Sequence, residues 1–113
     1  MSAFDYHGRR FRAVVNSDSG EVSGETIFQY FQENELLWAE YAGGAIRKGN
    51  IIGRVSPEGV ITMHYQHVNT GGEIRSGSCV SVPERLPSGL IRLHESWQWT
   101  AGEAGTSVIE ETV

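Results

Sequence analysis

The chain has 113 residues and a formal net charge of −5, and these numbers exclude several classes of protein. Its length predicts a single domain over residues 1–113, large enough to bury one core without cross-links. The nine basic residues are scattered, so a general nucleic-acid binder is not expected. The single cysteine, Cys79, rules out an intrachain disulfide, and no Cys/His cluster has metal-ligand spacing. We therefore expect neither a metal site nor a cofactor.

Targeting and membrane segments are not apparent in the sequence. Residues 1–12 contain no apolar run typical of a signal peptide. No stretch approaches the roughly 18 apolar residues of a membrane span. We expect a cytoplasmic protein that does not interact with membranes.

Fourteen glycines divide the chain into runs of β-branched and aromatic residues with period-2 alternation, the pattern of β-strands. In chain order, the predicted strands cover residues 9–16, 23–33, 35–42, 45–55, 60–69, 73–82, 90–100 and 106–113. The links between them are short and rich in Gly, Pro, Ser, Asn and Asp, which are turn residues.

Short links make neighbouring strands pair as antiparallel hairpins. Eight such strands in an open sheet would leave two exposed edges, whereas a closed barrel leaves none. The sequence therefore predicts an all-β, eight-stranded up-and-down (meander) barrel. A two-sheet sandwich is the structural alternative.

A repeated motif indicates two similar hairpins. The residues GGAIRKG at 43–49 recur as GGEIRSG at 71–77. These glycines open strands rather than helices, so turn formation is favoured over a phosphate-binding role.

The motif also predicts the register of both hairpins. A two-residue turn at Gly43-Gly44 would place Glu40 opposite Arg47 and Trp38 over Gly49. In the second hairpin, a three-residue loop at 70–72 pairs three sets of residues on one face: His67 with Arg75, Tyr65 with Gly77, and Met63 with Cys79.

Alternation then separates the inside of the barrel from the outside. The residues predicted to point inward on the remaining strands are Phe11, Ala13, Val15, Phe28, Tyr30, Ile91, Leu93, Glu95, Trp97, Trp99 and Val108. The opposite face of the central strands is polar and is expected to be wet.

A ligand site is predicted at the barrel end that carries the links after the first, third, fifth and seventh strands. Its expected lining residues are Trp38, Glu40, Arg47, Tyr65, His67, Arg75, Glu95, Trp97 and Trp99. Aromatic walls with a few polar groups are typical of small-molecule pockets. Two arginines would suit a carboxylate or phosphate, so we expect a small anionic or amphipathic ligand.

Two other functions compete with ligand binding. His67 and Glu95 are the candidates for acid–base partners of a small enzyme, although no catalytic motif is present and a non-enzyme is favoured. Alternatively, the ion pairs Arg47–Glu40 and Arg75–Glu95 plug the barrel. That protein would self-associate, for example as a homodimer, through an outer patch around Tyr41, Ile46, Ile52 and Ile74.

The run IRLHESWQWT at 91–100, with GGEIR at 71–75 and HVNT at 67–70, resembles a family of short bacterial proteins. Some members of that family carry the label N-acetylglutamate synthase, and the similarity covers nearly the whole chain. This label implies acetyl transfer, yet the chain lacks a Gln/Arg-x-x-Gly-x-Gly/Ala loop opening a helix. The expected fold is similar to the streptavidin and lipocalin-like (calycin) barrels.

Overall fold

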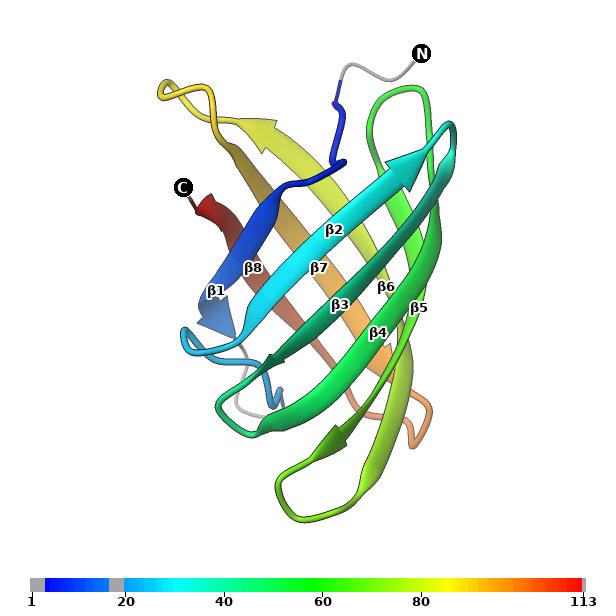
Figure 1. Ribbon diagram of the computed structural model, residues 1–113. Coiled ribbons are helices and arrows are strands. Elements are labelled where there is room, and N and C mark those ends of the chain that lie inside the picture. The colour runs from blue at the N-terminus through cyan, green and yellow to red at the C-terminus, as the bar shows by residue number, and fades with distance from the viewer. Residues whose placement is uncertain (1–3, 17–19, 113) are drawn as a thin grey trace.

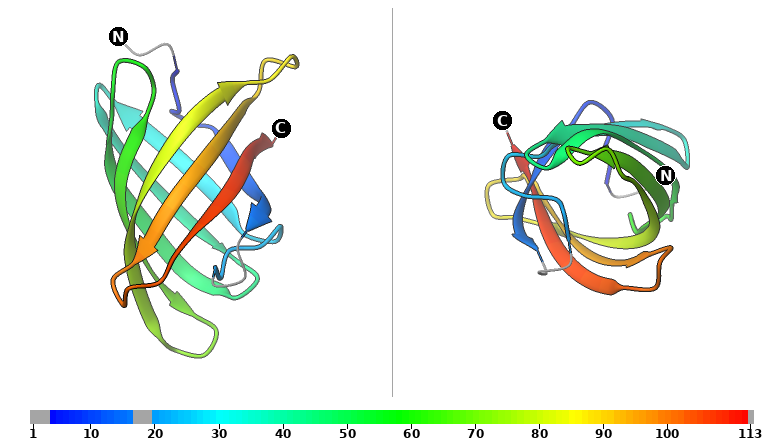
Figure 2. Two further views of the ribbon diagram at one scale, coloured as in Figure 1. Left: turned by 180° about the vertical axis from the view of Figure 1, so that it is seen from behind. Right: turned by 90° about the horizontal axis from the view of Figure 1, so that it is seen from below.

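Eight antiparallel strands close into a barrel in which each strand pairs with the next and β8 returns to β1 (Figure 1). The computed structural model describes residues 4–16 and 20–112. The strands are β1 (Arg10–Asn16), β2 (Ile27–Glu33), β3 (Leu36–Gly43), β4 (Ile46–Val55), β5 (Ile61–Asn69), β6 (Ile74–Arg85), β7 (Ile91–Trp99) and β8 (Ala104–Thr112). The predicted closed meander is confirmed, and the view along the barrel shows its ring of strands (Figure 2). Over the described residues, no helix is long and apolar enough to cross a lipid bilayer.

The links lie alternately at two ends of the barrel. The β1–β2, β3–β4, β5–β6 and β7–β8 links gather at the bottom of Figure 1, which we call the lower end. Residues 23–26, predicted to begin the second strand, belong instead to the β1–β2 link. This link folds back against the β3–β4 turn, where the Thr26 hydroxyl donates a 3.0 Å hydrogen bond to the Gly43 carbonyl.

The opposite, upper end is closed by the residues that precede β1. Tyr6 is fully buried, and its hydroxyl donates to the Gly59 carbonyl at 2.5 Å. Its ring packs against Phe11 and Tyr30, with centroids 6.4 and 6.2 Å away. The barrel interior therefore communicates with solvent through the lower end.

Alternation predicted most inward-facing side chains correctly. Phe11, Ala13, Phe28, Tyr30, Ile91, Leu93, Trp97 and Trp99 are all buried. The inward prediction for Val15 is wrong, since this side chain is 60% exposed and follows a bulge between Ala13 and Val15. The inward prediction for Val108 is also wrong, because the buried residues of β8 are its neighbours Ser107 and Ile109.

The β5–β6 hairpin has the predicted register. His67 pairs with Arg75, Tyr65 with Gly77, and Met63 with Cys79. The Tyr65 ring lies over Gly77, where an added Cβ would meet the phenol oxygen at 2.5 Å.

The register predicted for the β3–β4 hairpin is wrong because the turn lies one residue later. Gly43 pairs with Ile46, so the two turn residues are Gly44 and Ala45. A bulge between Tyr41 and Gly43 shifts the ladder further. Displacing a strand by one residue moves every side chain to the opposite face of the sheet.

A long-range contact explains why Gly43 is not a turn residue. Its φ of 119° favours glycine, and a Cβ there would collide with the backbone carbonyl of Glu25 in the β1–β2 link. Gly43 is therefore needed for the close approach of that link. Gly44, with a φ of 62°, opens the turn.

Three side chains that were predicted to point inward lie outside, Trp38 and Glu40 because of this register and Arg47 because β4 is irregular between Ile46 and Lys48. Glu40 and Arg47 are exposed, and Trp38 stacks on Phe31 on the outer surface with centroids 5.7 Å apart. The inward positions of β3 are held by Leu37, Ala39 and Tyr41. It is Tyr41, not Trp38, that covers Gly49.

We expect Gly49→Ala to lower the free energy of unfolding by about 1–3 kcal/mol, the usual cost of overpacking. The new Cβ would lie within 2.7 Å of the Tyr41 ring, which is held between Phe28 and His67. Chemical denaturation measures the loss. Gly71→Ala is the control, because its Cβ would make only ordinary contact and should change stability by less than about 0.5 kcal/mol. Equal losses in the two variants would contradict the prediction.

Candidate functional site

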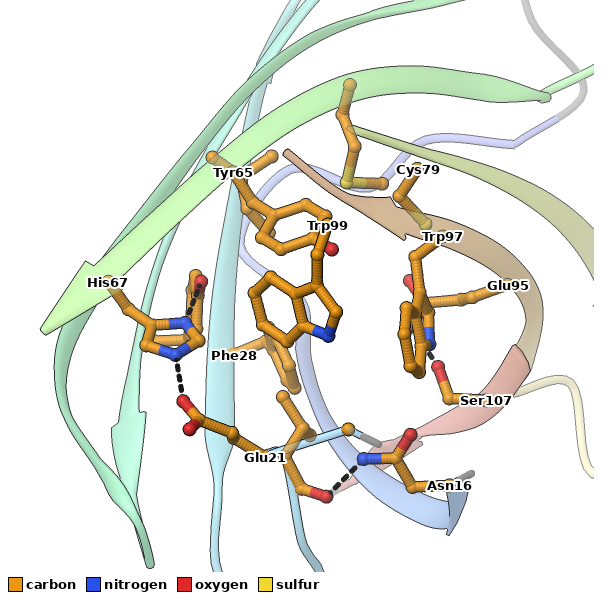
Figure 3. A pocket seen from close by; sticks show the side chains of 15 residues that line it. Asn16, Glu21, Phe28, Tyr65, His67, Cys79, Glu95, Trp97, Trp99 and Ser107 are labelled. Carbon is orange, nitrogen blue, oxygen red and sulfur yellow. Dashed lines mark hydrogen bonds and ion pairs between the residues drawn. The ribbon is translucent and has the colours of Figure 1, made fainter. Parts of the chain in front are cut away.

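A cavity of about 50 Å³ opens at the lower end of the barrel. This volume holds several water molecules, each of which needs roughly 10–15 Å³. The lining residues come from all eight strands and the β1–β2 link: Asn16, Gly20, Glu21, Val22, Phe28, Tyr41, Ile51, Met63, Tyr65, His67, Cys79, Glu95, Trp97, Trp99 and Ser107 (Figure 3).

Five of the nine predicted site residues line this cavity. These are Tyr65, His67, Glu95, Trp97 and Trp99. Arg75 lies at its rim, with its guanidinium carbon 4.2 Å from the centre of the Trp99 ring. Trp38, Glu40 and Arg47 are not brought to the site: the β3–β4 register places Trp38 and Glu40 outside, and the irregularity between Ile46 and Lys48 in β4 leaves Arg47 exposed.

His67 is buried and both of its ring nitrogens are engaged. Nε2 lies 2.7 Å from Glu21 Oε1, and Nδ1 lies 2.8 Å from the Tyr41 hydroxyl. In the neutral ring, Nε2 donates to the carboxylate and Nδ1 accepts from the phenol. The imidazole therefore joins the β1–β2 link to the wall formed by β3 and β5.

Glu21 gathers the polar groups at the rim. Besides His67, its carboxylate accepts hydrogen bonds from Asn69 Nδ2 at 3.0 Å and Arg75 Nη1 at 3.2 Å. Burial raises the pKa of Glu21, but hydrogen bonds from His67 and Asn69 and the charges of His67 and Arg75 outweigh it, so the pKa is lowered. Arg75 also pairs with Glu103 at 3.7 Å, so both acidic partners neutralise it.

Glu95 has a different environment deeper in the barrel. It accepts hydrogen bonds from the hydroxyls of Ser81, at 2.9 Å, and Ser107, at 3.0 Å. Burial raises the pKa of Glu95, and the two serine hydrogen bonds oppose this shift only in part. The predicted Arg75–Glu95 ion pair is wrong, because Arg75 binds Glu21 and Glu103 instead.

Aromatic rings form most of the cavity wall. Trp97 and Trp99 pack with centroids 5.8 Å apart, and Tyr65 meets Trp99 edge-on at 5.3 Å. The hydroxyls of Tyr65 and Tyr30 are buried and have no hydrogen-bond partner in the described part of the chain. Burial raises the pKa of both phenols, so they stay neutral.

Two other kinds of site, a cysteine nucleophile and a metal centre, receive less support from the described residues. Burial raises the pKa of the Cys79 thiol, which therefore stays protonated and is a poor nucleophile. Across residues 4–16 and 20–112, no three His, Cys, Asp or Glu side chains gather in a way that could hold a metal ion.

Sequence reasoning missed Glu21 and Tyr41. Glu21 lies in a link, and strand alternation says nothing about where a link folds. Tyr41 carried a usable signal, because Leu37, Ala39 and Tyr41 form an uncharged alternating set, whereas the opposite set would have buried Glu40.

The chain is similar to a known protein family. A family model described as avidin-like protein matches residues 4–112, which is nearly the whole chain. No curated protein and no solved structure matches. The match agrees with the streptavidin-like fold expected from the sequence.

We expect Tyr41→Phe to lower the free energy of unfolding by about 1–3 kcal/mol, because it leaves Nδ1 of the buried His67 without a partner. Tyr65→Phe is the matched control. Its hydroxyl has no hydrogen-bond partner among residues 4–16 and 20–112, so its removal should leave stability unchanged or increase it. Urea denaturation of both variants makes the comparison, and an equal loss in Tyr65→Phe would contradict this account.

The lowered pKa of Glu21 predicts a pH dependence of stability. A carboxyl group whose pKa is lower in the folded state stabilises the fold above its ordinary pKa of 4.5 and loses that contribution as pH falls through the folded value. Glu21→Gln should therefore reduce stability at neutral pH and converge with the wild type in acid. The raised pKa of Glu95 has the opposite effect on the pH dependence of stability, but Glu95 is present in both proteins. The difference between their pH–stability curves therefore isolates Glu21. A constant difference at all pH values would contradict the prediction.

Proposed function

The chain belongs to the avidin-like protein family, and we propose that it binds a small amphipathic molecule in the cavity at the lower end of its barrel. The observation that carries this proposal is a cavity with aromatic walls and a carboxyl group, Glu95, at depth. Avidin binds biotin, so the family itself is consistent with a small ligand. An apolar part of the ligand would lie along Trp97, Trp99 and Tyr65, and a polar part would meet Glu95.

The residues that would have favoured an anionic ligand are not assembled. Arg47 is exposed on the outer face. Arg75 is engaged by the carboxylates of Glu21 and Glu103 and stacks on Trp99. A carboxylate or phosphate entering the cavity would have to displace these partners, so we favour the amphipathic alternative without an anionic group.

An enzyme that uses His67 and Glu95, including the acetyl transfer implied by the N-acetylglutamate synthase label, stays a prediction. Both residues line the same cavity, as that hypothesis required. However, Glu21 and Tyr41 occupy both ring nitrogens of His67, so it has no free nitrogen to offer a substrate. Binding without catalysis is the better supported function.

A barrel plugged by ion pairs has less support. Neither predicted pair forms, and of the predicted outer patch Tyr41 and Ile46 are buried, while Ile52 and Ile74 are 58% and 80% exposed. Self-association as a homodimer stays a prediction, as does a cytoplasmic location.

A thermal-shift screen of small amphipathic metabolites tests the proposed function. A ligand at about one hundred times its Kd stabilises the fold by about 2.7 kcal/mol, which raises the Tm of a chain of this size by roughly 10–20 °C. Trp97→Ala should abolish the shift, because Trp97 lines the cavity. Trp38→Ala, on the outer surface, should preserve it. A ligand whose effect survives Trp97→Ala but not Trp38→Ala would contradict the proposed site.

A further inference from the structure

Glu95 is a carboxyl group at the deep end of the cavity, and none of the described residues gives it a cationic partner. Its oxygens accept hydrogen bonds from two neutral hydroxyls, those of Ser81 and Ser107. Within the described residues, no Arg, Lys or His side chain forms an ion pair with it. The basic groups closest to the site, Arg75 and His67, are bound to Glu21 at the rim.

The other groups that face Glu95 are neutral. Tyr30 from β2, Tyr41 from β3, Tyr65 from β5 and Cys79 from β6 lie close enough for its charge to raise their pKa values, in addition to the larger effect of burial. They are therefore protonated at neutral pH. An ionised carboxylate in such surroundings is unfavourable unless a positive charge joins it.

The cavity wall is suited to a positive charge. Aromatic faces attract cations through their quadrupoles, and Trp rings do so most strongly. The structure already contains one such contact at the rim, where the Arg75 guanidinium lies 4.2 Å from the Trp99 ring centre. Trp97, two residues after Glu95 on β7, packs beside Trp99 and lines the same cavity (Figure 3). The net charge of −5 also favours the approach of a cation.

We propose that the ligand carries a positively charged nitrogen with N–H groups, such as a primary or secondary ammonium, which pairs with Glu95 and packs against Trp97. This inference rests on the proposed function and specifies the ligand class for the same cavity. The Glu95 carboxylate would accept one N–H. The unpartnered Tyr65 hydroxyl, which is buried at the same site, offers a further acceptor.

The test compares three probes that share one alkyl chain: butylammonium, butanol and butyrate. Each is titrated at neutral pH into the ¹⁵N-labelled protein, and the indole signals of Trp97 and Trp99 report binding while Trp38 serves as the internal reference. Butylammonium should bind about tenfold or more tightly than butanol, and butyrate should bind most weakly. In Glu95→Gln, the affinity for butylammonium should fall about tenfold while that for butanol stays within about threefold. Glu40→Gln, which changes an exposed carboxylate, should leave both affinities unaltered.

A second measurement does not depend on a variant that folds. In the wild type, lowering the pH protonates Glu95 and should weaken butylammonium binding, whereas butanol binding should stay constant. Because the pKa of Glu95 is raised, this loss should begin at a higher pH than for an ordinary carboxyl group. Glu21 at the rim also titrates, so the measurement is repeated in Glu21→Gln, in which the loss should persist.

The outcomes distinguish this inference from the proposed function. If butanol or butyrate binds as tightly as butylammonium, the cationic ligand is refuted while the binding site stands. If butylammonium gives no response at the Trp97 indole, the cationic ligand is also refuted, and the thermal-shift screen decides separately whether the cavity binds a ligand. A tighter cation whose advantage survives both Glu95→Gln and low pH would likewise overturn the role of Glu95.

Discussion

Because β1 pairs with β8 along Arg10–Asn16, the eight strands have no free sheet edge and the alternate side chains of every strand meet in one interior. Because of this closure, a polar side chain on the inner face of a strand lies in the barrel interior and not in solvent. In an open sheet, Glu95 and His67 would face water. Inside the barrel they share a small volume with five aromatic rings. Each polar side chain there needs a hydrogen-bonding or charged partner, supplied either by the protein or by a ligand.

The lower end separates its charges into two layers. Glu21, His67, Asn69 and Arg75 form a rim in which each polar group binds another. Deeper in the barrel, Glu95 accepts hydrogen bonds from the hydroxyls of Ser81 and Ser107 and forms no ion pair with any residue that the structure describes. The rim thus fastens the β1–β2 link to the barrel, and the deeper layer is where we propose that a ligand binds. Mutations in the two layers should therefore have different effects, the first on stability and the second on binding.

The two hairpins show how far sequence reasoning extends. The β5–β6 register followed from local rules alone, because its loop closes on itself and Tyr65 over Gly77 was visible in the motif. The same rules failed for β3–β4, since Gly43 is required by the backbone of Glu25, a residue distant in sequence. Five of the cavity-lining residues could be predicted because strand alternation determines which side chains point inward. Glu21 could not be predicted, because only the folded path of a link brings it to His67.

The closed upper end has a consequence for the shape of any bound molecule. The fully buried Tyr6 is bonded to the Gly59 carbonyl at the upper end, and the cavity opens at the lower end. In the proposed complex only the head group of the ligand needs to fit the cavity, and the rest of the ligand can project from the lower end into solvent. The volume of the cavity would then limit the size of the bound group but not the size of the molecule that carries it.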